Sequence, residues 1–419
     1  MKQKQKRIKL PKFIRVLGPG LITGASDDDP SGIATYSQAG AKYGTHLLWT
    51  AIATYPLIVA MQEMCAKIGL ITDMGLTSVI KKYYPKYILY IILAMSIPSI
   101  ILNIGADIAG MGAVGNLIFP QIPSFVYSLL FTIILLAATI LWNYHRIAFI
   151  LKWLCIALFC YLIIPFVADT NWRETLISTF IPHIHFEAAY FMALVGILGT
   201  TISPYLFFWQ ATMEMEERNQ KRLIIDKVVM NDMRQDVRLG LALSNLVFYF
   251  IVLATGTVLF SNGIYTIDTV EQAAQALEPV AGQSAYILFT IGILGTGALA
   301  IPVLAGSLSY MLSEIFGWSE GLNKKFHEAK GFYISMIIAM LVGLLINLAG
   351  ISPVKMLFYT SVLYGIIAPV LIGLILHISN NKKIMGKYKN SPVMNVFGFL
   401  TLIIMTICVI ILIYMETSG

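Results

Sequence analysis

The stretch Gly24-Ala-Ser-Asp-Asp-Asp-Pro-Ser-Gly32 places three consecutive carboxylates, a proline and two glycines inside an otherwise apolar segment. Charge within a membrane is costly, and ionisable residues there mark functional sites. Proline and glycine interrupt a regular helix, and irregular backbone at membrane depth occurs only where it lines a cavity enclosed by protein. The stretch therefore predicts an unwound, anionic break in a membrane-spanning helix, an arrangement suited to holding a cation.

The composition is that of an integral membrane protein. Of 419 residues, 58% are hydrophobic and only 12% are charged, whereas soluble domains carry about 25% charged residues. The four cysteines have no CxxC spacing, which disfavours a disulfide or metal framework. The chain shows no phosphate-binding loop, HExxH motif or nucleophile–base pair, so we expect neither enzymatic activity nor a cofactor.

Apolar segments along the chain predict eleven membrane-spanning helices. One helical crossing needs about 20 predominantly apolar residues. The first, third, sixth and eighth predicted spans are longer than this, so we expect them to tilt, break or project. The predicted spans are approximately 14–43, 46–69, 87–117, 124–142, 147–168, 188–213, 237–261, 283–316, 331–350, 354–378 and 392–415.

Lysine and arginine indicate the orientation, because they concentrate in cytoplasmic connections. With the N-terminus inside, 26 of the 29 basic residues lie on the cytoplasmic side, and only Lys42, Arg173 and Lys355 lie outside. We therefore predict a multi-pass protein of the cell membrane with its N-terminus in the cytoplasm and its C-terminus outside. The basic clusters are interpreted as faces for lipid headgroups, not for nucleic acid, and no obligate protein partner is evident.

The sixth predicted span repeats the interruption of the first. The segment Gly196-Ile-Leu-Gly-Thr-Thr-Ile-Ser-Pro204 places two glycines, three hydroxyl residues and a proline at mid-membrane. The interruptions lie in spans one and six, an offset of five, so the second unit is inverted relative to the first, and paired interruptions of this kind indicate a secondary-transporter site. We predict a single transporter domain, 1–419, with repeats at about 14–168 and 188–378 and an extra helix at about 392–415.

The residue types at the two breaks suit a hard divalent cation. Carboxylates and unwound carbonyls supply oxygen, and Thr200, Thr201 and Ser203 offer hydroxyl groups, whereas neither break contains Met, Cys or His. Magnesium, calcium and manganese prefer oxygen ligands of this kind. The two breaks together therefore predict an oxygen-lined cation site.

The three aspartates of the first break are not equivalent. Asp29 directly precedes Pro30, where the backbone is held extended, so it is the preferred ligand. Asp27 and Asp28 are secondary candidates that could face a vestibule. Because three ionised neighbours repel one another, we expect at least one to be solvated, paired or protonated.

Several motifs spread along the chain add to this interpretation. They are Gly18-Pro-Gly-Leu-Ile, Asp29-Pro30, Gln38-Ala-Gly-Ala, Asn116-Leu-Ile-Phe119 and Phe289-Thr-Ile-Gly-Ile-Leu-Gly-Thr-Gly297. Together they resemble the Nramp family of divalent-metal transporters over nearly the whole chain. The resemblance implies an all-α membrane fold of eleven helices, a five-plus-five inverted repeat with broken helices one and six, and alternating access.

The chain departs from that family at positions to which the resemblance gives ligand roles. The family's Asp-Pro-Gly-Asn reads Asp29-Pro-Ser-Gly32 here, so Gly32 stands at an asparagine ligand position. The family's Ala-x-x-Met-Pro-His reads Thr200-Thr-Ile-Ser-Pro-Tyr205, so Ser203 replaces the methionine and Tyr205 the histidine linked to proton movement. The set of metal-binding residues implied here is Asp29, Gly32, Thr200 and Ser203, with Asp27, Asp28 and Ser361 secondary.

Two further departures concern the third and tenth helices. The family's third-helix Asp and Glu align with Ile104 and Asp107, and its tenth-helix glutamine aligns with Ser361. Asn103 and Asp107 lie one turn apart on the third predicted span, and we interpret them, with Tyr205, as coupling or pathway residues. The alternative for the pair is a structural hydrogen bond between helices.

These departures favour magnesium and disfavour tight proton coupling. Loss of the thioether weakens the preference for manganese and iron, and smaller side chains leave room for a partly hydrated ion, a pattern similar to that of Nramp-related magnesium transporters. We predict a transporter of divalent cations that favours Mg²⁺, with Mn²⁺ as a further substrate and weak or no proton coupling. One alternative is a proton-coupled Mn²⁺/Fe²⁺ symporter. The other is an organic-solute symporter of the same broken-helix fold, which the three aspartates disfavour.

Overall fold

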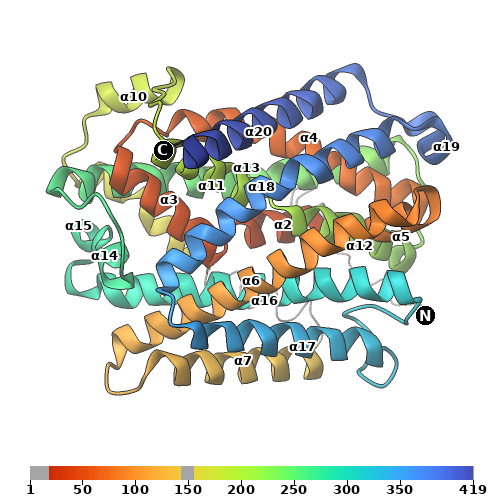
Figure 1. Ribbon diagram of the computed structural model, residues 1–419, viewed down its shortest axis with the longest axis horizontal. Coiled ribbons are helices and arrows are strands. Elements are labelled where there is room, and N and C mark those ends of the chain that lie inside the picture. The colour runs from red at the N-terminus through yellow and green to blue at the C-terminus, as the bar shows by residue number, and fades with distance from the viewer. Residues whose placement is uncertain (1–17, 143–154, 419) are drawn as a thin grey trace, which may run out of the picture.

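The computed structural model describes residues 18–142 and 155–418, and every regular element in these ranges is helical. Eight helical segments of the described residues are long and apolar enough to cross a membrane, and one of them, Ala188–Lys221, runs across the second break. Figure 1 shows that most of the long helices run in roughly the same direction as one another. The prediction of an all-α membrane protein is confirmed.

The helices follow the predicted spans closely. In chain order they are α2 (Pro19–Asp27), α3 (Pro30–Tyr43), α4 (Trp49–Thr72), α5 (Leu76–Tyr83), α6 (Lys86–Ile118), α7 (Ser124–Leu141), η1 (Cys155–Leu162), α9 (Ile164–Val167), α10 (Trp172–Phe180), α11 (Ala188–Thr201), α12 (Pro204–Lys221), α13 (Lys227–Val258), η2 (Phe260–Asn262), α14 (Val270–Gln275), α15 (Glu278–Ala281), η3 (Gly282–Ser284), α16 (Ala285–Phe316), α17 (Lys330–Ile346), η4 (Asn347–Ala349), α18 (Pro353–Asn380), α19 (Lys382–Met385), η5 (Gly386–Tyr388) and α20 (Pro392–Ser418).

Both predicted breaks are present. The first span is divided into α2 and α3 on either side of Asp28 and Asp29, and the sixth into α11 and α12 on either side of Ile202 and Ser203. In each case proline is the first residue of the second half, where its missing N–H and fixed φ cost the helix nothing. The proline thus starts a new helix and prevents the preceding one from continuing.

Three predicted spans differ from the described helices. The sixth was expected to end at 213, but α12 continues to Lys221. The seventh was expected at 237–261, but α13 begins ten residues earlier, at Lys227, because the Asp226 side chain caps its first turn by accepting from the backbone N–H groups of Val228 and Val229. The fifth predicted span, 147–168, lies partly outside the described residues. Its described part forms η1 and α9.

Glycines let the halves of the broken helices approach their neighbours closely. A Cβ on Gly24 of α2 would lie 2.3 Å from the backbone of Gly240 in α13, and a Cβ on Gly199 of α11 would lie 2.3 Å from the backbone N of Gly365 in α18. Small residues at such crossings let backbones pack directly on one another. This packing places α2 against α13 and α11 against α18.

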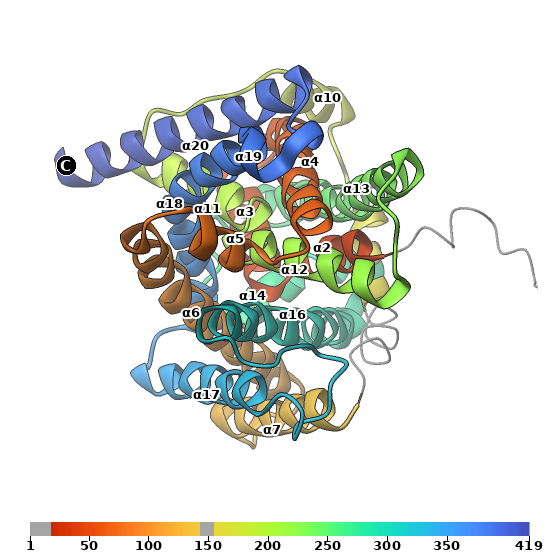
Figure 2. The ribbon, with the colours of Figure 1, turned by 90° about the vertical axis from the view of Figure 1, so that its right-hand side faces the viewer.

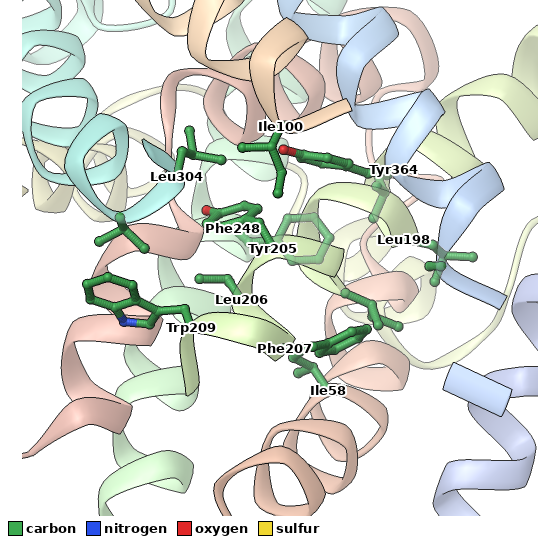
Figure 3. Close-up of a cluster of buried hydrophobic side chains, with 14 of the residues drawn as sticks. Ile58, Ile100, Leu198, Tyr205, Leu206, Phe207, Trp209, Phe248, Leu304 and Tyr364 are labelled. Carbon is green, nitrogen blue, oxygen red and sulfur yellow. The ribbon is translucent and has the colours of Figure 1, made fainter. Parts of the chain in front are cut away.

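The second half of the sixth span lies in the middle of the molecule. Figure 3 shows Tyr205, Leu206 and Phe207 of α12 surrounded by apolar side chains from several other helices. Trp209 and Phe207 have no exposed surface. In contrast, α20 lies at one edge and α7 and α17 at the opposite edge in both views (Figures 1 and 2). The two breaks are therefore enclosed by protein.

Candidate metal-binding site

Asp29 is buried at the first break and its carboxylate is held from three directions. Its side chain is 2% exposed. Oδ1 accepts from the hydroxyl of Ser31 at 2.6 Å and from the backbone N–H of Gly32 at 2.7 Å, and the second contact makes Asp29 the N-cap of α3. Oδ2 accepts from Nδ2 of Asn103 on α6 at 2.9 Å. These bonds fix the carboxylate in one orientation between α3 and α6.

Gly32 and Thr200 bring the two breaks into contact beside this carboxylate. A Cβ on Gly32 would lie 3.2 Å from Oγ1 of Thr200, 3.4 Å from Oδ1 of Asp29 and 3.2 Å from the carbonyl oxygen of Asp27. Three oxygens from both broken spans therefore surround one small cradle. A longer side chain at position 32 would enter this space, so glycine keeps it open.

Asn103 and Asp107 both face this region from α6 but differ in their hydrogen bonds. Oδ1 of Asn103 accepts from the hydroxyl of Thr360 on α18 at 3.1 Å, so the amide links Asp29 to that helix. Asp107 has no exposed surface and lies within electrostatic range of Asp29 and of the backbone N–H of Ser31, but neither of its oxygens makes a hydrogen bond of good geometry among the described residues. A buried carboxylate with so little compensation is costly, which makes Asp107 a second candidate for contact with a cation or proton.

The other two aspartates of the triplet face a different helix. Oδ2 of Asp27 and Oδ1 of Asp28 both accept from the hydroxyl of Ser244 on α13, at 3.0 and 3.1 Å. Both aspartates are buried, whereas the sequence suggested that they could face a vestibule. Ser244 was not predicted. Its only sequence signal is a hydroxyl within the apolar middle of a predicted span.

Ser203 and Ser361 are buried near the breaks, and their hydroxyls bond to backbone or to neighbouring hydroxyls. Ser203 donates to the carbonyls of Thr200 and, at 3.3 Å, Gly199, which satisfies the end of α11. Ser361 accepts from Thr35 of α3 at 2.9 Å. In the described part of the chain no hydrogen bond links Ser203 to Asp29, so Ser203 joins the site through the Thr200 turn and not by direct contact with the carboxylate.

Tyr205 connects the two broken spans by a hydrogen bond from α12 to α2. Its hydroxyl donates to the carbonyl of Ser26 at 2.9 Å. That carbonyl belongs to the last turn of α2, where helical carbonyls lack partners within the helix. Nearby, Thr23 donates to Gln210, which in turn donates to Glu214 at 2.9 Å. These buried groups form a polar chain between α2 and α12 that sequence reasoning did not predict.

The chemistry of the site is dominated by oxygen. The Gly32 cradle combines the Asp29 carboxylate with the hydroxyl of Thr200 and the carbonyl oxygen of Asp27. Within the described residues, no group of three or more His, Cys, Asp and Glu side chains is arranged to hold a metal ion. A thioether and the first break border the same glycine. A Cβ on Gly297 would lie 2.8 Å from Sδ of Met111 and 3.2 Å from Cγ of Pro30. The sequence pattern at the breaks did not predict this thioether.

The sequence matches the family model described as "Nramp: Natural resistance-associated macrophage protein-like" over residues 20–415. This chain belongs to the Nramp family. Members of the family are transporters and not enzymes, which agrees with the multi-pass architecture and with the two breaks. The resemblance inferred from the motifs is confirmed.

Individual relatives span nearly the same length. Proteins named divalent metal cation transporter MntH from Caldanaerobacter subterraneus and Clostridium acetobutylicum are 24% and 26% identical, cover 98% of this chain, and are themselves covered over 96% and 93% of their lengths. The crystal structure of the Eremococcus coleocola manganese transporter superposes with a TM-score of 0.78 at 17% identity, covering 100% of this chain and 90% of that one. The structural likeness supports the Nramp fold.

Proposed function

We propose that this Nramp-family chain moves divalent metal cations across the membrane by alternating access, with Asp29 as the principal ligand. The observation on which the proposal chiefly depends is the buried, oriented Asp29 carboxylate at the first break, which lies beside Thr200 of the second break through the Gly32 cradle. Discontinuous helices of this kind place cation sites where two repeats meet. The names of the MntH relatives support divalent metal as the substrate class.

Within this class, we propose Mg²⁺ as the favoured substrate. Magnesium dehydrates reluctantly and keeps several waters when it is held by one or two carboxylates. The glycine at position 32 leaves the cradle open, and the residue at the second break is Ser203, which offers oxygen instead of sulfur. Thr200 belongs to the same proposed ligand set, Ser361 is a secondary ligand, and Asp107 is a coupling or pathway residue beside the site.

Manganese transport is the second candidate, and two observations favour it. The Eremococcus coleocola neighbour is named a manganese transporter, and the thioether of Met111 borders Gly297, the glycine that also borders Pro30 of the first break. Soft sulfur ligands favour transition metals over magnesium. In this candidate function the substrate is Mn²⁺ or Fe²⁺, and transport is coupled to protons.

For either metal, the lysine and arginine distribution supports an inward-facing N-terminus, an outward-facing C-terminus and location in the cell membrane. A dication entering a negative interior gains about 4.6 kcal/mol per 100 mV of membrane potential. This driving force suffices for uptake without proton coupling. The absence of a histidine at position 205 supports weak or no coupling.

The test is metal uptake into proteoliposomes by the wild type and by Asp29→Asn. Because the substitution keeps the shape of the side chain but removes its charge, we expect uptake of Mg²⁺ and Mn²⁺ to fall to the background of empty liposomes. Asp232→Asn is the matched control, because Asp232 is exposed on α13, and its uptake should equal that of the wild type. Normal uptake by folded Asp29→Asn would reject Asp29 as the ligand.

The same preparation separates the two candidate functions. Uncoupled Mg²⁺ transport predicts uptake driven by membrane potential without acidification of the lumen. Proton-coupled Mn²⁺ transport predicts acidification in fixed proportion to metal uptake, together with poor competition by Mg²⁺.

A further inference from the structure

A basic pocket lies at the end of the molecule that contains the starts of α13 and α20. Its volume is about 610 Å³, and five of its lining side chains are cationic. They are Lys67, Lys227, Arg234, Lys387 and Lys389. The lysine and arginine distribution assigns this end to the cytoplasm, so the pocket faces the inner leaflet and the cytosol.

Negative charge inside the pocket is scarce. Asp226 is its one acidic lining residue, and Oδ1 of this side chain already accepts from the backbone N–H groups of Val228 and Val229 at 2.8 and 2.9 Å. Arg234 shares Glu63 with Arg238, at distances of 3.7 and 2.6 Å. The remaining four cations have no carboxylate within 4 Å among the described residues. The pocket therefore has an excess of positive charge.

Lys67 is the most informative of these residues. It is 3% exposed, and its ammonium group donates to neutral atoms, Oδ1 of Asn390 at 2.6 Å and Sδ of Met394 at 3.8 Å. Glu63 acts on it electrostatically, but that carboxylate is paired with Arg234 and Arg238. Buried charges in proteins are normally paired, because an unpaired one bears the full cost of desolvation. An anion held in the adjoining pocket would supply the missing counter-charge.

Backbone geometry makes the pocket firm. Two long helices, α13 and α20, start at its wall, and their first turns are fixed by side-chain caps, Asp226 on α13 and Ser391 on α20. The hydroxyl of Tyr388 donates to the carbonyl of Ile225 at 3.2 Å, which ties the segment after α19 to the segment before α13. Lys387 and Lys389 flank this tie and are thereby positioned at the pocket mouth.

We propose that this pocket binds a phosphate group. Its size exceeds that of a monatomic anion, and several lysines converging on one space are suited to the charge of a phosphate. Basic pockets between membrane helices on the cytoplasmic side bind phospholipid headgroups. Beside the pocket, Val393 and Val396 on α20 are 65% and 56% exposed, a surface on which acyl chains of an anionic lipid would lie. Free phosphate is the other source of the same chemistry.

The experiment uses the full-length protein in nanodiscs and measures the midpoint of thermal unfolding. One arm compares phosphatidylcholine discs with discs that also contain phosphatidylglycerol. The other arm adds inorganic phosphate to phosphatidylcholine discs, with sodium chloride at equal ionic strength as the reference. Stabilisation in the first arm alone identifies a lipid headgroup, and stabilisation in the second identifies free phosphate. Either result supports the site if the pocket variants weaken the stabilisation and the control variant does not.

The variants distinguish this pocket from general surface charge. Lys387→Gln/Lys389→Gln removes two charges at the pocket, and we expect the apparent affinity for the stabilising anion to fall roughly tenfold to thirtyfold. Lys382→Gln/Lys383→Gln removes two exposed charges from neighbouring α19, outside the lining, and should retain wild-type affinity. The single variants Lys387→Gln and Lys389→Gln replace the double variant if it fails to fold.

Two results would overturn the proposal. One is that neither anion stabilises the wild type more than sodium chloride does. The other is that both double variants lose the same amount of stabilisation, because this would indicate a diffuse surface effect. Neither result bears on metal transport, so the pocket and the proposed function stand or fall separately.

Discussion

Asn103 Nδ2 donates a 2.9 Å hydrogen bond to Oδ2 of Asp29, although the two residues are 74 positions apart in the chain. Because Oδ1 of the same amide accepts from Thr360, one side chain connects the carboxylate of the first break to two packed helices. This connection distinguishes Asp29 from Asp27 and Asp28, which share Ser244 instead. The orientation of the proposed ligand is thus set from α6.

Asn103→Leu should weaken metal uptake by removing this donor while keeping the side chain's size. A hydrogen bond to a charged group contributes about 1.5–3 kcal/mol, so we expect the KM for metal uptake to rise roughly tenfold or more, with a smaller change in maximal rate. Thr360→Val is the graded control, because Asn103 still contacts Asp29 in that variant. An unchanged KM in folded Asn103→Leu would show that the amide does not position the ligand.

Ser203→Met should shift metal preference towards manganese. The substitution places a thioether at the second break, and soft sulfur favours transition metals. Competition between Mg²⁺ and Mn²⁺ for uptake is the measurement, and we expect Mg²⁺ to compete less well than in the wild type. Met111→Leu removes the sulfur near Pro30 and should shift competition in the opposite direction if that sulfur reaches the ion. An unchanged profile in Ser203→Met would exclude this position as a ligand.

Gly24→Ala should destabilise the fold through a direct clash between α2 and α13. The new Cβ would lie 2.3 Å from the backbone of Gly240, and overpacking of this kind costs about 1–3 kcal/mol or more. Gly373→Ala on α18 is the control, because its Cβ would meet only one side-chain atom, at 4.0 Å, and alanine favours a helix over glycine. We expect a lower unfolding midpoint for Gly24→Ala and an equal or higher one for Gly373→Ala.

Local chemistry explains how much of this structure could be predicted from the sequence. Pro30 and Pro204 determine where helices one and six restart, because proline cannot continue a helix and begins one well. Apolar length similarly predicts most spans. The start of α13 at Lys227 was missed because an aspartate cap extends the helix beyond its apolar part.

The partners of the site residues were harder to predict, because they depend on which face of one helix packs against another. Asn103 was recognised as a polar residue in a span, but its contact with Asp29 required the position of α6. Ser244 and Thr360 offer ordinary hydroxyls, and hydroxyls within spans often bond to the preceding turn of their own helix. Nothing local distinguishes those that reach a neighbouring helix from those that do not.

A histidine cluster between the α3–α4 turn and the segment before α11 predicts a pH effect on stability. Nδ1 of His46 lies 2.9 Å from Nε2 of His185, and the rings of His46 and His183 stack with centroids 5.0 Å apart. Burial lowers the pKa of His46, nearby His183 and His185 lower it further, and Glu174 acts in the opposite sense. The folded state therefore favours the neutral ring.

Because the pKa of His46 is lower in the folded than in the unfolded chain, the unfolded state binds the proton first. The stabilising contribution is complete above the unfolded value of about 6.5 and is lost as pH falls through it towards the folded value. Glu320, whose pKa is raised to about 8 mainly by burial, acts in the opposite direction by losing stability as pH rises. The absolute pH slope therefore mixes several groups, and only a comparison with a variant isolates His46.

The comparison is between the wild type and His46→Gln, whose side chain does not titrate. Between about pH 7.5 and pH 5.5, we expect the temperature of the unfolding midpoint to fall further for the wild type than for the variant. Only the wild type takes up the extra proton at position 46 on unfolding. The control is Glu320→Gln, introduced separately into the wild type and into His46→Gln. Sites without shared partners act additively, so this change should leave the difference between the two backgrounds unchanged. An equal fall of the unfolding midpoint in the wild type and in His46→Gln would show that the stability of the fold does not depend on a neutral His46.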